Sequence, residues 1–211
     1  VDEKNELGGT TIYQESANFK IENQISSEWL KKEIKELKKL NNLEVKIRTS
    51  VAAYHGYNFL LARENLTDHL SKNEKQKKIR QRLLKIRAKK VIIATGALER
   101  PLVFNNNDRP GIMLSSAVKK YADYYGVISG RKTVFFTNND SAYESAISLN
   151  NKGIMVKAII DIRDESKSKI IKEVEDLGIK IYWSHTITDT HGYKRLKEIS
   201  VMGLSKDSQS V

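Results

Sequence analysis

Strand and helix patterns alternate in the second half of the chain, and this alternation constrains the fold more than any other feature. Short apolar runs at 133–137, 155–160 and 179–183 predict strands, and the segments between them, 143–151 and 166–177, predict helices. Strands that alternate with helices pair in parallel, because each helix returns the chain along the sheet. The sequence therefore predicts an α/β fold with a parallel βαβαβ unit.

The first turn of this unit is polar. It reads Asn138-Asn139-Asp140-Ser141, and the next strand ends at Asp161. This spacing resembles a dinucleotide half-site, in which a turn holds the pyrophosphate and an acid holds the ribose. The turn has no glycine, however, so its side chains would obstruct a phosphate from reaching the backbone amides. We expect that it does not bind a dinucleotide in the usual way, and that it binds another polar ligand or lies at a domain interface.

A second apolar run, Val91 to Ala94, leads into Thr95 and Gly96. A short apolar run closed by glycine predicts a buried strand that ends in a tight turn. A glycine at that position lets a ligand lie against the main chain, because it has no Cβ. Nucleotides bind at such strand ends in open α/β sheets.

The first residues, Val1-Asp2-Glu3, have the character of a strand end. An acid in that place accepts hydrogen bonds from a ribose diol, usually about 20 residues after a glycine-rich loop. That loop and its strand would precede Val1, so we interpret the chain as part of a longer domain. The alternative is that Glu3 is a surface acid at a chain end, and the residues leave both interpretations open.

An amphipathic helix is predicted over 26–40, with Ser26 or Ser27 as its cap. Further strands are predicted at 45–51, 57–63 and 82–87. They form a small antiparallel sheet inserted at about 45–88.

A polar loop is predicted at 71–78, a helix at 115–125 that ends at Gly126, and two antiparallel strands around His191-Gly192. The resulting domains are residues 1–110, a partial dinucleotide-binding domain with the β insertion, and residues 111–211, a second Rossmann-like domain truncated at its C-terminus.

The net charge is +11, but the lysines are mixed with glutamates along the helices. This pattern favours a solvated surface over a nucleic-acid groove. The chain contains no cysteine and no run of roughly 18 apolar residues, so we expect neither thiolate chemistry nor membrane insertion, and a cytoplasmic location is compatible.

The histidines show no catalytic or metal-binding spacing, so we expect no catalytic residue and no metal site in this chain; they are His55, His69, His185 and His191. Asp108 and Arg109 form a polar pair in a Pro-Gly loop. A structural ion pair is the default interpretation, and contact with a flavin or a partner subunit is the alternative.

Several stretches together resemble a known family. Glu3 followed by Gly8-Gly9, and the Ala94-Thr95-Gly96 strand end, resemble the glutathione-reductase-like flavoproteins with two dinucleotide-binding domains. The stretches 94–104, 106–114 and 137–143 are similar to the alpha subunits of heterotetrameric sarcosine oxidases. So are Arg63-Glu64, 67–70 and 86–88, and the resemblance covers nearly the whole chain.

The resemblance implies a Rossmann-type fold whose N-terminal strand is missing here. Enzymes of this family oxidise sarcosine to glycine, with hydrogen peroxide and formaldehyde or methylenetetrahydrofolate as further products. NAD binds the alpha subunit, FMN lies at the alpha–beta interface and FAD lies in the beta subunit. The implied partners are the beta, gamma and delta subunits, with sarcosine and tetrahydrofolate bound elsewhere in the complex.

The resemblance also implies site residues in this chain. Glu3 would bind the ribose, and Lys4 would lie near the adenosine. Val51 would meet the adenine through its main chain, and Thr95 and Gly96 would lie beside the cofactor.

Two alternatives stay open. The first is a subunit of a related amine or opine oxidase, or of a cyanide-forming glycine oxidase. The second, from another class, is a basic nucleic-acid-binding or scaffolding module.

Overall fold

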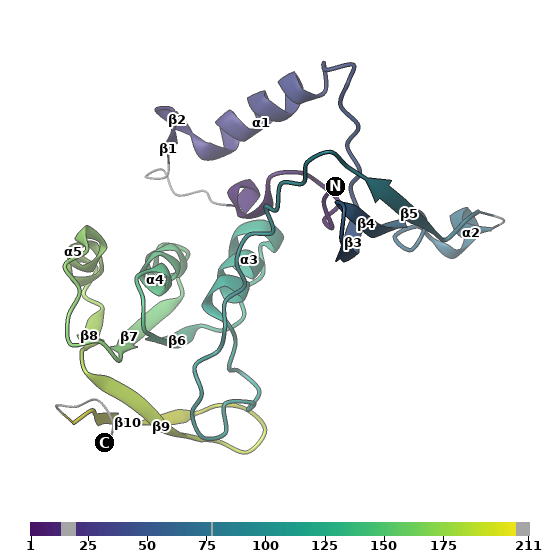
Figure 1. Cartoon of the computed structure of the whole chain (residues 1–211). Helices are drawn as coiled ribbons and strands as arrows, with labels where there is room; N and C mark the ends of the chain where they lie inside the picture. Colours follow the sequence, from purple (N-terminus) through teal and green to yellow (C-terminus); the bar gives the residue numbers. More distant parts are fainter. Residues whose placement is uncertain (14–19, 77, 206–211) are drawn as a thin grey trace. The chain divides into compact units, whose positions relative to one another are not determined.

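The computed structural model describes residues 1–13, 20–76 and 78–205 (Figure 1). The chain forms two compact units, Val1–Ala97 and Leu98–Val211. The boundary between the two units falls before the domain boundary predicted at residue 110. The reason is that the loop containing Asn105 and Asn106 forms hydrogen bonds with the second unit. The side-chain amides of Asn105 and Asn106 donate to Asp189 Oδ1 at 3.0 and 2.9 Å. Residues 206–211 of the predicted second domain lie outside the described residues.

The first unit begins with a 3-10 helix, η1 (Gly9–Tyr13), and a short hairpin of β1 (Lys20–Ile21) and β2 (Gln24–Ile25). Helix α1 (Ser26–Leu37) follows directly and ends before the predicted residue 40. Its N-cap is Ile25 and Ser26 is already buried in the helix, so the predicted serine cap is wrong. The hairpin strand runs straight into the helix and leaves the serines inside its first turn.

The predicted antiparallel insertion is confirmed, but its first strand lies at 49–55 and not at 45–51. Strands β3 (Thr49–His55), β4 (Phe59–Asn65) and β5 (Gln81–Arg87) pair antiparallel in the order β3-β4-β5. Tyr57 and Asn58 take positive φ values of 59° and 53° in the first connection. A register shift between Val51 and Ala53 marks a bulge in β3.

The region predicted as a polar loop contains a short helix, α2 (Lys72–Lys75). Ser71 and Glu74 form a capping box, in which the Ser71 amide donates to Glu74 Oε2 at 3.0 Å. The Ser-x-x-Glu spacing is a recognised helix start, so this correction was readable from the sequence.

The strand predicted at Val91–Ala94 is wrong. Residues 91–100 contain no strand, and the side chains of Ile92 and Ile93 are 92% and 69% exposed. A strand needs a hydrogen-bonded neighbour, and no described strand pairs with this segment. The apolar run has the composition of a buried strand but lacks the partner that would bury it.

The second unit contains the predicted βαβαβ arrangement. It comprises α3 (Ser115–Tyr125), β6 (Lys132–Thr137), α4 (Ser141–Asn151), β7 (Met155–Asp161), α5 (Lys169–Asp176) and β8 (Lys180–Tyr182). The three strands are parallel in the order β6-β7-β8. The three helices cover one face of this sheet (Figure 1).

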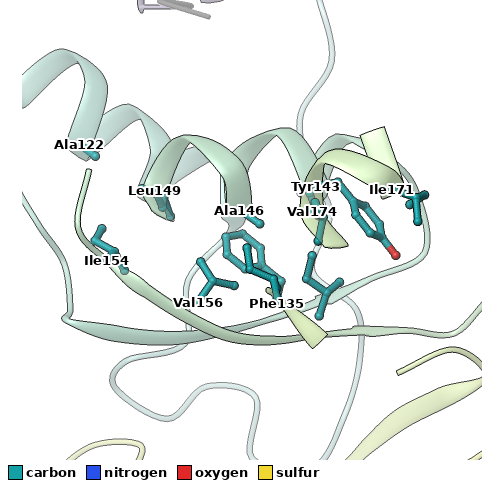
Figure 2. Close-up of a cluster of buried hydrophobic side chains, with 12 residues drawn as sticks. Ala122, Phe135, Tyr143, Ala146, Leu149, Ile154, Val156, Ile171 and Val174 are labelled. Atoms are coloured by element: carbon teal, nitrogen blue, oxygen red, sulfur yellow. The ribbon is translucent and has the colours of Figure 1, made fainter. Parts of the chain in front are cut away.

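The opposite face carries the antiparallel hairpin β9 (His185–His191) and β10 (Glu198–Gly203) (Figure 1). Side chains alternate along β7, so Ile159 packs among the core residues and Ile160 lies toward the hairpin. The core is built from the strands and from α4 and α5, with Phe135, Ala146, Leu149, Val156 and Val174 among its members (Figure 2).

The ends of α3 are fixed by two residues. The amides of Ser115 and Ser116 donate to the Glu99 carboxylate at 3.0 and 2.8 Å, which satisfies donors at the helix N-terminus. Burial opposes ionisation of Glu99, but these bonds and those of the serine hydroxyls hold its pKa below the ordinary value. Gly126 ends the helix in the left-handed region, as predicted. None of the helices in the described part of the chain has the length and apolar character needed to cross a bilayer.

Candidate functional site

A polar pocket of about 140 Å³ lies in the first unit. Its lining combines one acid, two arginines, a histidine and two neutral polar residues: Glu3, Arg48, Ser50, Arg63, Asn65 and His69. Glu3 is therefore in a pocket, as expected of a ligand-binding acid. The other five residues were missed by the sequence analysis.

The sheet register explains why these side chains converge. Ser50 of β3 pairs directly with Arg63 of β4, so both side chains emerge on the same face. Asn65 lies two residues along β4, and Arg48 lies two residues before Ser50. Asn65 projects to that face too, because side chains alternate along a strand. Arg48 lies just before β3 with a φ of 51°, and its side chain also lines the pocket.

Backbone hydrogen bonds attach the first residues of the chain to this sheet. The Asp2 amide donates to Lys46 O, the Thr49 amide to Asp2 O and the Arg48 amide to Lys4 O, at 2.8, 2.8 and 2.7 Å. These bonds hold Glu3 at the pocket.

The side chains of Glu3 and Lys4 lie together. Lys4 Nζ approaches Glu3 Oε1 at 2.9 Å. The hydrogen bond and the positive charge of this lysine hold the pKa of Glu3 below its usual value. The acid is therefore ionised at neutral pH and able to accept two hydroxyl donors.

The other predicted site residues are placed less directly. Val51 follows Ser50 on β3, and its side chain is 43% exposed. Thr95 and Gly96 belong to the extended segment after Ala94, and Gly96 has a φ of +70°. Neither lines the pocket. The structure thus gathers Glu3 and Lys4 beside the β3 strand that carries Val51.

A second polar cluster lies in the other unit, where β6 and β7 end. Asp161 is fully buried, and its carboxylate accepts hydrogen bonds from the Tyr143 hydroxyl at 2.7 Å and from Arg163 Nη2 at 2.7 Å. Arg163 also forms an ion pair with Asp140 at 2.8 Å. The network ties the turn after β6 to the end of β7.

The network shifts the pKa values of Arg163 and Tyr143. The hydrogen bond from Arg163 to Asp161 raises the pKa of the guanidinium, against the effect of its partial burial. Burial, reinforced by the Asp161 hydrogen bond, raises the pKa of the Tyr143 hydroxyl. The Tyr143 hydroxyl therefore stays protonated and donates to Asp161.

The turn after β6 is closed by its own side chains. Asn139 Oδ1 accepts the Ser141 amide at 3.0 Å, and Thr137 Oγ1 accepts the Asn139 amide at 3.1 Å. The Asp140 carboxylate adds a negative charge, and Ser166 donates to it at 3.1 Å. These contacts favour the expectation that this turn does not hold a pyrophosphate, because two of its amides are already engaged and it carries an acid.

Arg109 has a structural role in the second unit. Its guanidinium donates to Thr190 Oγ1 and Thr190 O, both at 3.2 Å, and to the Gly192 carbonyl. Asp108 and Arg109 form no ion pair within the described part of the chain, so the default interpretation of this pair is wrong. Arg109 instead fastens the loop to β9.

The histidines lie in separate places. His69 lines the pocket, His185 Nδ1 lies 2.5 Å from Trp183 O, and His191 Nε2 lies 2.7 Å from Ser200 Oγ. Among residues 1–13, 20–76 and 78–205, no group of three or more potential ligands is arranged to hold a metal ion.

Comparison with known proteins connects this architecture to a family. The chain is 35% identical over 211 residues to the sarcosine oxidase subunit alpha of Corynebacterium sp. (strain P-1), which covers 99% of this chain. It is 32% identical over 211 residues to the same subunit from Rhizobium meliloti (strain 1021), which covers 97%. This chain is related to sarcosine oxidase alpha subunits. It spans 21% of the length of each of these relatives.

The sequence resemblance to sarcosine oxidase alpha subunits is thereby confirmed. No family model matches the chain. Thioredoxin reductase from T. acidophilum is similar in structure, with a TM-score of 0.61 and 16% identity, over 95% of this chain and 60% of that protein. L-proline dehydrogenase from P. horikoshii has a TM-score of 0.56 and 20% identity, over 98% of this chain and 33% of that protein. These similarities confirm the predicted Rossmann-type α/β fold class.

Proposed function

We propose that this chain is the NAD-binding segment of a sarcosine-oxidase-like alpha subunit. Glu3 accepts hydrogen bonds from the adenosine ribose, with Lys4 beside it and the main chain at Val51 toward the adenine. Thr95 and Gly96 lie on the cofactor side of their segment. The whole complex oxidises sarcosine, with FAD and FMN bound elsewhere together with the beta, gamma and delta subunits.

The observation that carries this proposal is the position of Glu3 at a polar pocket in a chain related to sarcosine oxidase alpha subunits. An ionised carboxylate has more acceptor positions than its contact with Lys4 uses, and such a group matches a vicinal diol. The low pKa of Glu3 keeps that acceptor available at neutral pH. Catalysis is assigned to other parts of the complex, in a cytoplasmic assembly.

The polar cluster around Asp161 is a poorer site for a ribose, which supports assigning that role to Glu3. Asp161 holds the position of a ribose acid in the βαβαβ unit, but Tyr143 and Arg163 already occupy its carboxylate. Releasing it would leave the buried Tyr143 hydroxyl without its acceptor, at a cost of about 1–3 kcal/mol, while Arg163 would keep only Asp140. Glu3 is the better of the two acids for an incoming diol.

Substituting Glu3 with glutamine is expected to weaken NAD binding by about 1–3 kcal/mol, because the ribose hydroxyls lose a charged acceptor. Isothermal titration of NAD into the natural full-length polypeptide measures the change. Glu6→Gln, a nearby exposed acid that does not line the pocket, is the matched control. Equal affinity of Glu3→Gln and the parent protein would contradict the proposal.

A further inference from the structure

The pocket beside Glu3 has an excess of positive charge. Glu3 is the single acid in its lining, and it is already paired with Lys4. Arg48 and Arg63 supply two guanidinium groups. Within the described residues, neither of these side chains forms an ion pair or a hydrogen bond.

Two acids near this sheet, Glu64 and Asp68, bind other cations. Glu64 follows Arg63 on β4, so its side chain lies on the opposite face. There it accepts from Lys46 Nζ at 3.5 Å and Arg82 Nη1 at 3.3 Å. Asp68 accepts from Arg80 Nε at 2.6 Å. Among the described residues, Glu64 and Asp68 are therefore paired with cations other than the two pocket arginines.

Neutral donors complete the lining. Asn65 Oδ1 accepts the Asp68 amide at 3.2 Å, which leaves the NH2 group of Asn65 as the part that can donate to a ligand. Ser50 adds a hydroxyl beside Arg63. Two guanidinium groups with hydroxyl and amide donors are the side chains that bind phosphate oxygens, because each phosphate accepts several charge-assisted hydrogen bonds.

The volume limits what enters. About 140 Å³ is below the roughly 300–1,000 Å³ of sites that enclose a whole small ligand. It suits one polar part of a larger molecule. The combination of Glu3 with Arg48 and Arg63 calls for a part that has both hydroxyl donors and a negative charge.

We propose that the pocket is a site for a phosphorylated ribose, in which Arg48 and Arg63 bind the phosphate while Glu3 accepts a ribose hydroxyl. This inference rests on the proposed function, because Glu3 serves both. The phosphate has two possible sources: the 5′-phosphate of an adenylate group, as in any NAD molecule, or a 2′-phosphate on the adenosine. In either case the sheet inserted between α1 and residue 88 supplies phosphate contacts independently of a glycine-rich loop.

The test is isothermal titration of the natural full-length polypeptide with adenosine, adenosine 5′-monophosphate and adenosine 2′-monophosphate. At least one nucleotide is expected to bind roughly ten- to hundred-fold more tightly than adenosine. Arg63→Gln removes this advantage and leaves adenosine affinity within about two-fold, whereas Arg63→Lys, which retains the charge, keeps part of it. Arg82→Gln, on the opposite face of the sheet, keeps all of it. The preferred nucleotide identifies the source of the phosphate.

Two results would overturn the inference while leaving the proposed function intact. One is equal affinity for adenosine and both nucleotides. The other is an equal loss of the nucleotide's advantage in Arg63→Gln and Arg82→Gln. In both cases NAD still binds, and its affinity still depends on Glu3. Failure of the proposed function gives a different pattern. NAD and all three adenosine compounds then fail to bind, or bind Glu3→Gln as tightly as the parent protein, and this pattern overturns both.

Discussion

Substituting Asp161 with alanine is expected to lower the free energy of unfolding of the second unit by about 3 kcal/mol. The carboxylate is fully buried and accepts from Tyr143 and Arg163. Its removal leaves the Tyr143 hydroxyl without an acceptor in the core. Arg163 side-chain exposure is 29%, and this residue keeps Asp140 as a partner, so the loss lies at the lower end of the range for breaking a buried ion pair.

The chain offers a direct readout of this change. It contains two tryptophans, and Trp183 packs on the core of the second unit, with its ring stacked on Tyr143 at a centroid distance of 6.2 Å. In a Trp29→Phe background, tryptophan fluorescence during urea unfolding follows the second unit alone. Glu165→Ala, an exposed acid of the same unit, is the control and is expected to change stability by less than about 0.5 kcal/mol. An equal loss in both variants would rule out the network as a source of stability.

Adjacent isoleucines of β7 are expected to differ in their contribution to stability. Ile159 is fully buried in the core beneath the helices, so Ile159→Ala should cost about 4 kcal/mol through lost transfer energy and the cavity left behind. Ile160 borders an apolar cavity of about 380 Å³ between the sheet and the hairpin. Ile160 is buried too, but the cavity beside it is already unfilled, so we expect its truncation to cost less, about 2 kcal/mol.

The same fluorescence-detected urea unfolding measures both isoleucine variants. Their side chains are identical in size and adjacent in sequence, so each is the control for the other. A larger loss for Ile160→Ala than for Ile159→Ala would show that the hairpin side, not the helix side, holds the main core of the unit.

The second unit was the most predictable part of the chain. Its strands are continuous apolar runs and its helices are amphipathic, so the periodicity alone fixes the type and order of the elements. Asp161 was correctly singled out as the acid at a strand end. Its capture by Tyr143 and Arg163 was not predictable, because that contact depends on how α4 packs against β7.

The Glu3 pocket shows where sequence reasoning stops. Glu3 was selected because of its position near a strand end, but Arg48 and Arg63 were not. Their convergence depends on the pairing of Ser50 with Arg63, and the bulge between Val51 and Ala53 shifts that register along β3. A one-residue error in register moves a side chain to the opposite face.

The segment Val91–Gly96 shows the opposite failure. Its composition is that of a buried strand, and the prediction assumed a neighbouring strand to pair with it. Burial depends on such a neighbour, which local composition cannot supply. Thr95 and Gly96 lie in this unpaired segment. Their place beside a cofactor therefore stays a prediction.

The most direct test of the central claim is a crystal structure of the natural full-length polypeptide with NAD bound. We expect the adenosine ribose to lie within hydrogen-bonding distance of the Glu3 carboxylate, while Asp161 keeps its bonds to Tyr143 and Arg163. A ribose bound instead at Asp161, with the pyrophosphate at the Asn138–Ser141 turn, would contradict it.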